Sequence, residues 1–92
     1  MRLLVTPTFE RAVKKLHSQQ KSELDEAVRT IADNPECGEA KVGDLQGVRV
    51  YKFRLSNRLF MLAYRILDED SLKLLTCGPH ENFYRDLKRQ EK

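Results

Sequence analysis

The chain of 92 residues has a formal net charge of +3, and its 40% hydrophobic and 34% charged residues exclude a disordered chain. Its length predicts a single domain over residues 1–92, and its longest apolar run, residues 59–64, is far shorter than the roughly 20 residues of a membrane helix. Two cysteines and the lack of a secretory signal pattern predict a cytoplasmic protein with reduced thiols and no membrane contact.

The first half of the chain predicts a strand followed by two helices. Residues 2–5 read as a strand, and Thr6 can cap a helix that has Pro7 at its first position. Polar residues 17–22 separate this helix from a second one, which Asn34-Pro35 ends. Apolar side chains recur at helical spacing in both, at Phe9, Ala12, Val13 and Leu16 and then at Leu24, Ala27, Val28, Ile31 and Ala32. We interpret the pair as a helical hairpin that covers a sheet.

The second half begins with an expected loop over residues 34–47 and then changes to strand periodicity. From Val48, apolar and charged side chains alternate, with Tyr51, Phe53 and Leu55 on one face and Val50, Lys52 and Arg54 on the other. Further strands are expected at residues 59–67 and 72–77, after turns at 56–57 and 68–70. The alternation predicts that one face of this sheet packs on the helices while the other presents cations.

A final helix is predicted from about His80, with Phe83 and Leu87 one turn apart on its apolar side. The element order is therefore β-α-α-β-β-β-α. This order predicts an α+β fold, in which a small antiparallel sheet of about four strands packs against the N-terminal helical hairpin and is followed by a C-terminal helix.

The positive charge is concentrated in one block. Residues 48–67 contain five basic side chains and no acidic one, whereas residues 1–47 and 68–92 each carry a net charge of −1. Lys52 and Arg54 lie about 7 Å apart on one face of the strand, and Arg58 follows the turn. Such a row suits the phosphates of a nucleic acid. The alternative is a solvated sheet face whose cations serve only solubility.

A second candidate region is the strand-to-helix junction over residues 78–85. Unpaired N–H groups at the start of a helix favour anions, and the imidazole of His80 can transfer protons near neutral pH. Tyr84 follows four residues later and shares a side of the predicted helix with His80. The alternative is that His80 is a polar cap and Tyr84 a packing residue.

Other chemistries have little support in the sequence. Cys77 and His80 have the spacing of a metal-binding pair, but Cys37 and His17 stand alone, whereas zinc sites combine two close pairs. The sequence contains no serine-nucleophile motif, phosphate-binding loop or dinucleotide fingerprint. We therefore expect neither a metal nor a cofactor.

Three segments together resemble a known family. They are GDLQGVRVYKFRL at residues 43–55, LFMLAYR at residues 59–65 and GPHENFYRDLKR at residues 78–89. With two preceding helices that end in Asn-Pro, nearly the whole chain resembles the RelE/ParE superfamily of bacterial type II toxins. The resemblance implies a small α+β toxin with a dedicated antitoxin. RelE-type members cut mRNA in the ribosomal A site, whereas ParE-type members inhibit DNA gyrase and are not nucleases.

The RelE branch implies roles for individual residues. Lys52 and Arg54 correspond to its strand cations, Tyr84 to its C-terminal tyrosine, and His80 to the histidine that some members carry after the last strand. One departure is Met61, which occupies the position of an arginine three residues before the middle-strand tyrosine. Arg58 is the nearest arginine and the candidate to replace it.

These residues suggest how RNA could be cleaved by its own 2′-OH group. The reaction needs a base, an acid and cations near the developing charge. We expect His80 to serve as base or acid, with the base favoured because a helix N-terminus disfavours imidazolium. Lys52, Arg54 and Arg58 would supply charge, and Tyr84 would stack on a base or contact the phosphate. The sequence therefore predicts an mRNA endonuclease that acts with ribosomes and is neutralised by an acidic antitoxin, and the alternatives are a gyrase inhibitor and a non-toxic binding protein.

Overall fold

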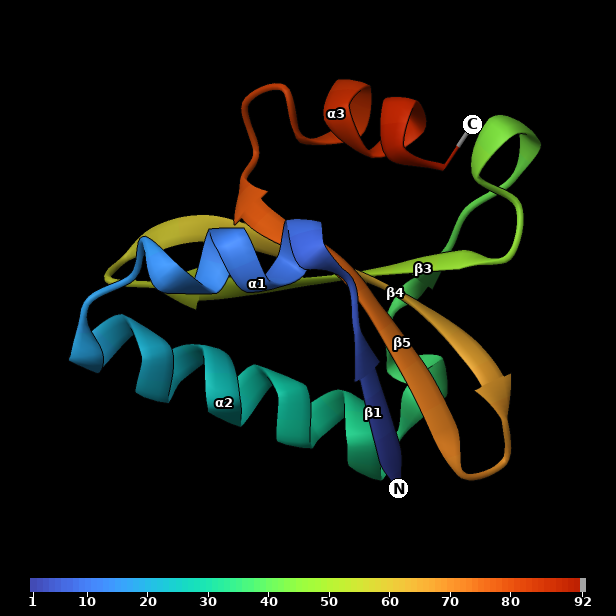
Figure 1. Cartoon of the computed structure of the whole chain (residues 1–92), viewed down its shortest axis with the longest axis horizontal. Coiled ribbons are helices and arrows are strands. Elements are labelled where there is room, and N and C mark those ends of the chain that lie inside the picture. The colour runs from blue at the N-terminus through green and yellow to red at the C-terminus, as the bar shows by residue number, and fades with distance from the viewer. Residues whose placement is uncertain (92) are drawn as a thin grey trace.

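The computed structural model describes residues 1–91, which form one sheet between two helical layers (Figure 1). The strands are β1 (Arg2–Val5), β2 (Glu39–Ala40), β3 (Val48–Leu55), β4 (Arg58–Asp68) and β5 (Ser71–Pro79). The helices are α1 (Pro7–Lys14), α2 (Ser18–Asp33) and α3 (Phe83–Gln90), with short 3₁₀ turns η1 (Pro35–Cys37) and η2 (Gly43–Leu45). Helices α1 and α2 cover one side of the sheet, the helical-hairpin face, and α3 covers the other, the α3 face. The predicted α+β fold is confirmed.

The five strands are arranged in the order β1-β5-β4-β3-β2. The predicted meander of β3, β4 and β5 is antiparallel, and β2 adds a short antiparallel strand within the expected loop. The sheet differs from the expected all-antiparallel one because β1 runs parallel to β5. Parallel neighbours need a long connection, and the segment from α1 to β4 provides it here. No helix among residues 1–91 is both long and apolar enough to span a membrane.

The two N-terminal helices begin at polar caps. The Thr6 hydroxyl accepts a hydrogen bond from the Phe9 amide at 3.0 Å and donates to the Leu75 carbonyl at 2.6 Å, so it caps α1 and fastens it to β5. Helix α2 begins at Ser18, earlier than its apolar pattern suggests. The His17 amide donates to Gln20 Oε1 at 3.1 Å, which closes the first turn of α2 within the polar segment.

The β3–β4 hairpin has the predicted two-residue turn and the predicted alternation. Ser56 and Asn57 have φ angles of 50° and 67°, as in the type I′ turns that match the twist of paired strands. Tyr51 and Phe53 pack against the core of the helical-hairpin face. Lys52 therefore points to the α3 face, where its cross-strand neighbour is Met61. Within this part of β3, the aromatic side chains and Lys52 thus lie on opposite faces of the sheet.

Helix α3 begins at Phe83, three residues later than predicted. Gly78 and Pro79 extend β5, and Asn82 then adopts a left-handed conformation, φ 60°, which asparagine tolerates better than most residues. His80 therefore lies in the connection before the helix rather than in its first turn. The electrostatic argument that favoured His80 as a base does not apply to this geometry.

Contacts along its length hold α3 against the sheet. Phe83 and Leu87 are buried in a core with apolar side chains of β3, β4 and β5. The Gln90 amide donates to the Leu75 carbonyl at 2.9 Å, and Arg65 pairs with Glu91 at 2.9 Å. These contacts position α3 across the sheet face that bears Lys52.

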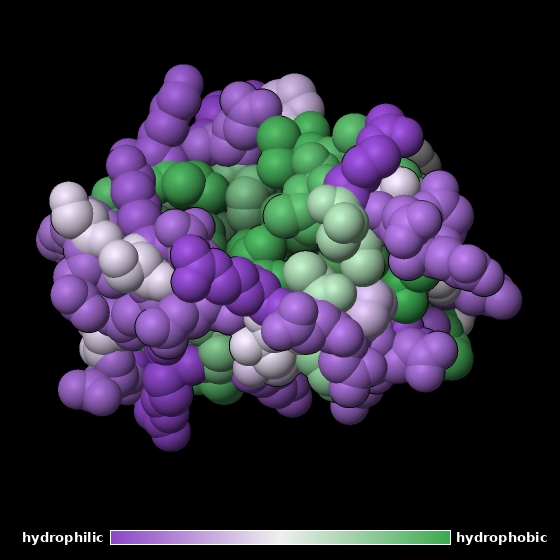
Figure 2. Space-filling view, turned by 90° about the horizontal axis from the view of Figure 1, so that it is seen from below, coloured by the Kyte–Doolittle hydropathy of each residue, from purple (hydrophilic) through white to green (hydrophobic). Residues whose placement is uncertain are grey.

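Apolar side chains are also exposed at the edge of the sheet. Seen from below, the molecule shows an apolar area within an otherwise largely polar face (Figure 2). Leu3, Leu4 and Val5 of β1 are each 41–44% exposed. Because β1 is an edge strand, its outer backbone groups are open to pairing with another chain.

Candidate functional site

Lys52 and Arg54, the two predicted phosphate-binding residues, lie together on the α3 face. Both are exposed, and their cross-strand neighbours on β4 are Met61 and Leu59. Side chains of directly opposed residues share a face of a sheet, and Met61 packs in the core beneath α3. Lys52 therefore borders the sheet surface that α3 partly covers, whereas Arg54 donates to the Asn57 carbonyl at 3.1 Å, at the β3–β4 turn.

His80 and Tyr84 meet beside this surface. Their ring centres are 6.5 Å apart, with ring planes at 85°, and the Tyr84 ring also packs edge-on against Phe83. β5 pairs with β4 up to Pro79 opposite Phe60. His80 is the first residue after β5, so it lies beyond the end of this strand pairing. The junction predicted from sequence thus brings the imidazole and the phenol together.

Two further residues of this face, Glu39 and Lys41, were missed by the sequence analysis. β2 places Glu39 opposite Val50, and the Lys41 amide donates to the Val48 carbonyl at 2.9 Å. Both side chains therefore point to the α3 face. Lys41 Nζ lies 4.9 Å from the centre of the Tyr84 ring, within cation–π range, and it also pairs with the Glu39 carboxylate.

We call these residues the α3-face cluster: Glu39, Lys41, Lys52, Arg54, His80 and Tyr84. Its charges act on one another. The Lys41 ammonium group lowers the pKa of the Glu39 carboxyl group, and the charge of Lys52 acts in the same direction. Hydrogen bonding to Glu39, followed by contact with Tyr84, raises the pKa of Lys41. At neutral pH the cluster therefore combines an ionised carboxylate with several cations.

Arg58, the remaining predicted site residue, is not brought to this cluster. It is the cross-strand neighbour of Leu55, which is buried in the core of the helical-hairpin face. The Arg58 side chain consequently leaves the backbone on the face opposite Lys52. On the α3 face, Met61 occupies the position at which the resemblance implies an arginine, and its side chain is completely buried.

Tyr64 and Arg49 hold the segment that leads into β2. The Tyr64 hydroxyl donates to the Pro35 carbonyl at 2.5 Å and accepts from the Gly38 amide at 3.0 Å. Arg49 Nη1 donates to the carbonyls of Gly38, at 2.8 Å, and Glu36, at 3.0 Å. Burial raises the pKa of Tyr64, so its hydroxyl remains a donor. These four bonds position β2 and, with it, Glu39 and Lys41.

The two cysteines lie in different surroundings. Cys77 is buried in the core of the helical-hairpin face, and burial raises its pKa to about 11. Cys37 is exposed on η1. Within residues 1–91, no three His, Cys, Asp or Glu side chains gather closely enough to hold a metal ion.

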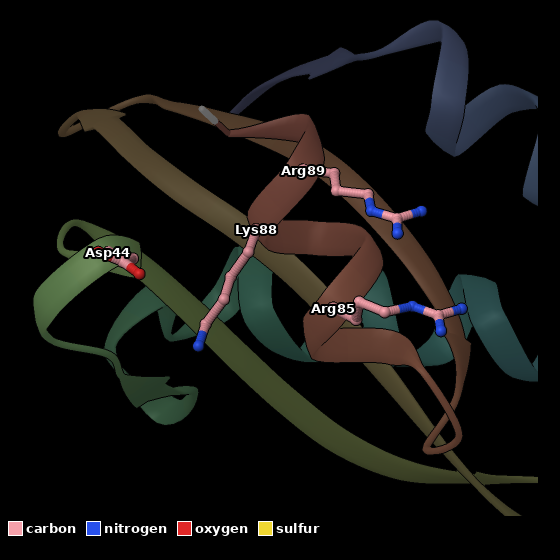
Figure 3. A pocket seen from close by; sticks show the side chains of 4 residues that line it. All are labelled: Asp44, Arg85, Lys88 and Arg89. Carbon is pink, nitrogen blue, oxygen red and sulfur yellow. The ribbon is translucent and has the colours of Figure 1, made fainter.

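A shallow pocket of about 420 Å³ lies between α3 and η2, outside the α3-face cluster (Figure 3). Asp44, Arg85, Lys88 and Arg89 line it. Lys88 extends from α3 on the side of Asp44, whereas Arg85 and Arg89 extend on the other side. The pocket contains none of the predicted site residues. We therefore assign the candidate site to the α3-face cluster, where an imidazole, a phenol, a carboxylate and cations lie on one face.

Comparison with known proteins gives a family match and a shared fold. Residues 3–88 match the ParE-like toxins of type II bacterial toxin–antitoxin systems. No functionally curated protein matches the sequence. A chain of the intact E. coli RelBE toxin–antitoxin complex aligns with a TM-score of 0.67 at 20% identity, over 87% of this chain and 96% of that chain.

E. coli RelE is similar in other states as well. A variant of RelE with two arginines replaced by alanine, in the free state, gives a TM-score of 0.72 at 18% identity, over 95% of this chain and 90% of that chain. The same variant bound to an antitoxin RelBc peptide gives a TM-score of 0.68 at 19% identity, over 94% of this chain and 92% of that chain. At these identities the likeness establishes the fold. Because the family match extends over most of the chain, the protein belongs to the ParE-like toxins of the RelE/ParE superfamily and is the toxin of a type II toxin–antitoxin system.

Proposed function

We propose that this toxin is a ribosome-dependent mRNA endonuclease that inhibits translation in the cytoplasm and is neutralised by a cognate antitoxin. The observation that carries the proposal is the α3-face cluster itself. Tyr84 contacts both His80 and Lys41, and Lys41 pairs with Glu39. Groups able to transfer protons are thus grouped beside cations on one exposed face.

The cluster can supply each part of an RNA cleavage by 2′-OH attack. The 2′-oxygen bonds to the adjacent phosphorus while the bond to the 5′-oxygen breaks, which leaves a cyclic phosphate and a 5′-hydroxyl. The Glu39 carboxylate is ionised and can accept the 2′-OH proton. His80 can then donate a proton to the departing 5′-oxygen. Lys52 and Arg54 stabilise the charge that develops on the phosphate.

The function can be tested by brief induction of the toxin in cells, followed by primer extension on translated and untranslated copies of one mRNA. The wild type should cut only the translated copy. His80→Ala should lower the cleavage rate by roughly 100-fold or more, as loss of a proton-transfer group does. Lys21→Met, on the exposed side of α2, is a control that should cut like the wild type. Undiminished cleavage by His80→Ala would exclude the assigned role.

Gyrase inhibition is the second candidate function. Two observations favour it: the matching family is described as ParE-like, and Met61 places an apolar, buried side chain at the centre of the α3 face. Under this alternative, induction leaves translated mRNA intact, and linear plasmid DNA and a DNA-damage response accumulate. The same induced cultures therefore distinguish the two functions.

The proposed partner is a small antitoxin whose toxin-binding segment is acidic. RelBE is a complex of toxin and antitoxin, and a RelB peptide is bound in a second RelE structure. For this chain, the exposed cations Lys52 and Arg54 on the α3 face supply the matching charge. If charge dominates the contact, its affinity falls steeply between 50 and 500 mM salt. If apolar packing dominates, its affinity changes little.

A further inference from the structure

Lys41 lies between two partners of different exposure. Its ammonium group is 4.9 Å from the centre of the Tyr84 ring and pairs with Glu39. The Lys41 side chain is only 21% exposed, whereas that of Glu39 is 63% exposed. The ammonium group is thus sheltered against the aromatic ring, and the carboxylate is the partner that an incoming ligand can reach.

We propose that Lys41 exchanges partners when RNA binds. Its ammonium group breaks its ion pair with the Glu39 carboxylate and pairs instead with a phosphate of the RNA, while the Lys41 side chain keeps its contact with the Tyr84 ring. This inference rests on the proposed nuclease function. An exposed carboxylate is a weakly held partner, because water screens the attraction. A phosphate that also contacts Lys52 and Arg54 is held by several charge-assisted bonds at once.

The arrangement of the α3 face explains why this cation has to come from the segment after β2. Met61 fills the middle of the face with a buried apolar side chain, and Arg58 leaves the sheet on the opposite face. Lys52 and Arg54 both belong to β3. Lys41 therefore approaches a bound phosphate from a second direction, beside Tyr84.

The exchange also changes Glu39. In the free protein, Lys41 is the main cause of the lowered pKa of Glu39, with a smaller effect of Lys52. When Lys41 turns to a phosphate, the carboxylate loses its closest cation and binds a proton more readily. RNA binding would thereby release the carboxylate at the moment when the 2′-OH proton has to be accepted.

The exchange can be tested by binding a fluorescent 2′-O-methyl oligoribonucleotide, which cannot be cleaved by 2′-OH attack, over a range of salt concentrations. Lys41→Met should weaken binding by about 10-fold and lower the slope of log affinity against log salt by about 0.7, the loss of one phosphate contact. Lys41→Arg should retain binding. Lys21→Met removes a lysine from α2 and should bind like the wild type.

The distinguishing variant is Glu39→Gln. It should bind the oligonucleotide more tightly, because Lys41 no longer has a competing partner, yet cleave translated mRNA more slowly. In the double variant Lys41→Met/Glu39→Gln, the gain in affinity should disappear, since the gain acts through Lys41. The double variant is decisive, because loss of the Glu39 charge alone would also relieve repulsion of the phosphate and raise affinity with or without Lys41.

The possible failures are separable. If Glu39→Gln gains the same affinity with and without Lys41, the two side chains act independently and the exchange is refuted. The exchange is also refuted if Lys41→Met binds like the wild type. If the wild type leaves translated mRNA intact, the nuclease function itself fails, and the exchange fails with it. Thermal unfolding of each variant checks that it is folded. If Lys41→Met does not fold, the binding and cleavage of Lys41→Arg and Glu39→Gln decide the outcome.

Discussion

The Tyr64 hydroxyl oxygen lies 3.0 Å from the Gly38 amide nitrogen, from which it accepts a hydrogen bond, and the contact leaves no room for a side chain at residue 38. A Cβ atom there would lie 2.5 Å from the same oxygen and 2.9 Å from the ring. Gly38 has an ordinary extended conformation, with φ −74°. The glycine is therefore required by space rather than by backbone conformation.

The first prediction concerns this contact. Tyr64→Phe deprives the Pro35 carbonyl and the Gly38 amide of a buried partner, which should cost about 1 to 3 kcal/mol of unfolding free energy. Urea unfolding measures this loss. Since β2 follows directly after Gly38, cleavage of translated mRNA should decrease as well.

Two glycine variants provide the control. Gly38→Ala forces the Tyr64 ring or β2 to move, and it should reduce cleavage. Gly43→Ala meets nothing within 4 Å but has a φ of +66°, so its cost is conformational and remote from the contact. If both variants reduced cleavage equally, the contact with Tyr64 would not be what positions β2.

The second prediction compares two cations of one hairpin. Lys52 points to the α3 face and Arg58 starts on the opposite face. Lys52→Ala should reduce cleavage by about 10- to 100-fold through loss of charge stabilisation. Arg58→Ala removes the same charge nearby and should retain most of the activity. Single-turnover cleavage on programmed ribosomes measures the rate of both variants. Equal losses of rate would show that the net charge of the protein matters, rather than the face of the sheet on which the cation lies.

The third prediction concerns Met61. Its side chain is completely buried in the core that includes Phe83 and Leu87. Met61→Arg would bury a charge beneath α3, which should destabilise the fold by several kcal/mol or displace the helix. Met61→Leu nearly conserves volume and should cost less than about 1.5 kcal/mol. Urea unfolding of both variants tests this; an arginine tolerated as well as leucine would contradict the packing role.

The fourth prediction concerns stability at high pH. Burial raises the pKa of Cys77 from 9.0 to about 11, so the folded state keeps this proton more tightly than the unfolded chain does. The contribution is intact below about pH 9 and is lost between pH 9 and 11, a decrease on the order of 2 to 3 kcal/mol. The raised pKa of Tyr64 acts in the same direction.

Urea unfolding at pH 8, 9, 10 and 11 measures this decrease. Cys77→Ala removes the buried thiol and should show a smaller loss between pH 9 and 10. Cys37→Ala, at the exposed thiol, should follow the wild type. A decrease of equal size in all three proteins would assign it to other groups.

The sequence predicts the fold and part of the site because the relevant patterns are long. Eight residues of β3 alternate between faces, which is enough to separate Tyr51 and Phe53 from Lys52 and Arg54. The start of α3 is less predictable. A helical pattern extends as far as its apolar residues, but the left-handed conformation of Asn82 ends the preceding connection and moves His80 out of the helix.

Glu39 and Lys41 could not be recognised in the same way. β2, which contains Glu39 and is followed by Lys41, has two residues, too few to establish a period, and it lies among glycines and a proline that predict a loop. Its position depends on bonds from Tyr64 and Arg49, which are 26 and 11 residues away from Gly38 in the chain. Contacts of this kind exist only once the sheet has formed.

The parallel pairing of β1 with β5 delays folding of the chain during its synthesis. Thr6 bonds to Leu75 across 69 positions of the chain, so the first strand has no partner until β5 has been made. His80 and Tyr84 come later still. A nascent chain lacking them cannot assemble the α3-face cluster, and long-range pairing of this kind is slow to form. β5, His80 and Tyr84 must therefore all have been synthesised before the α3-face cluster can form.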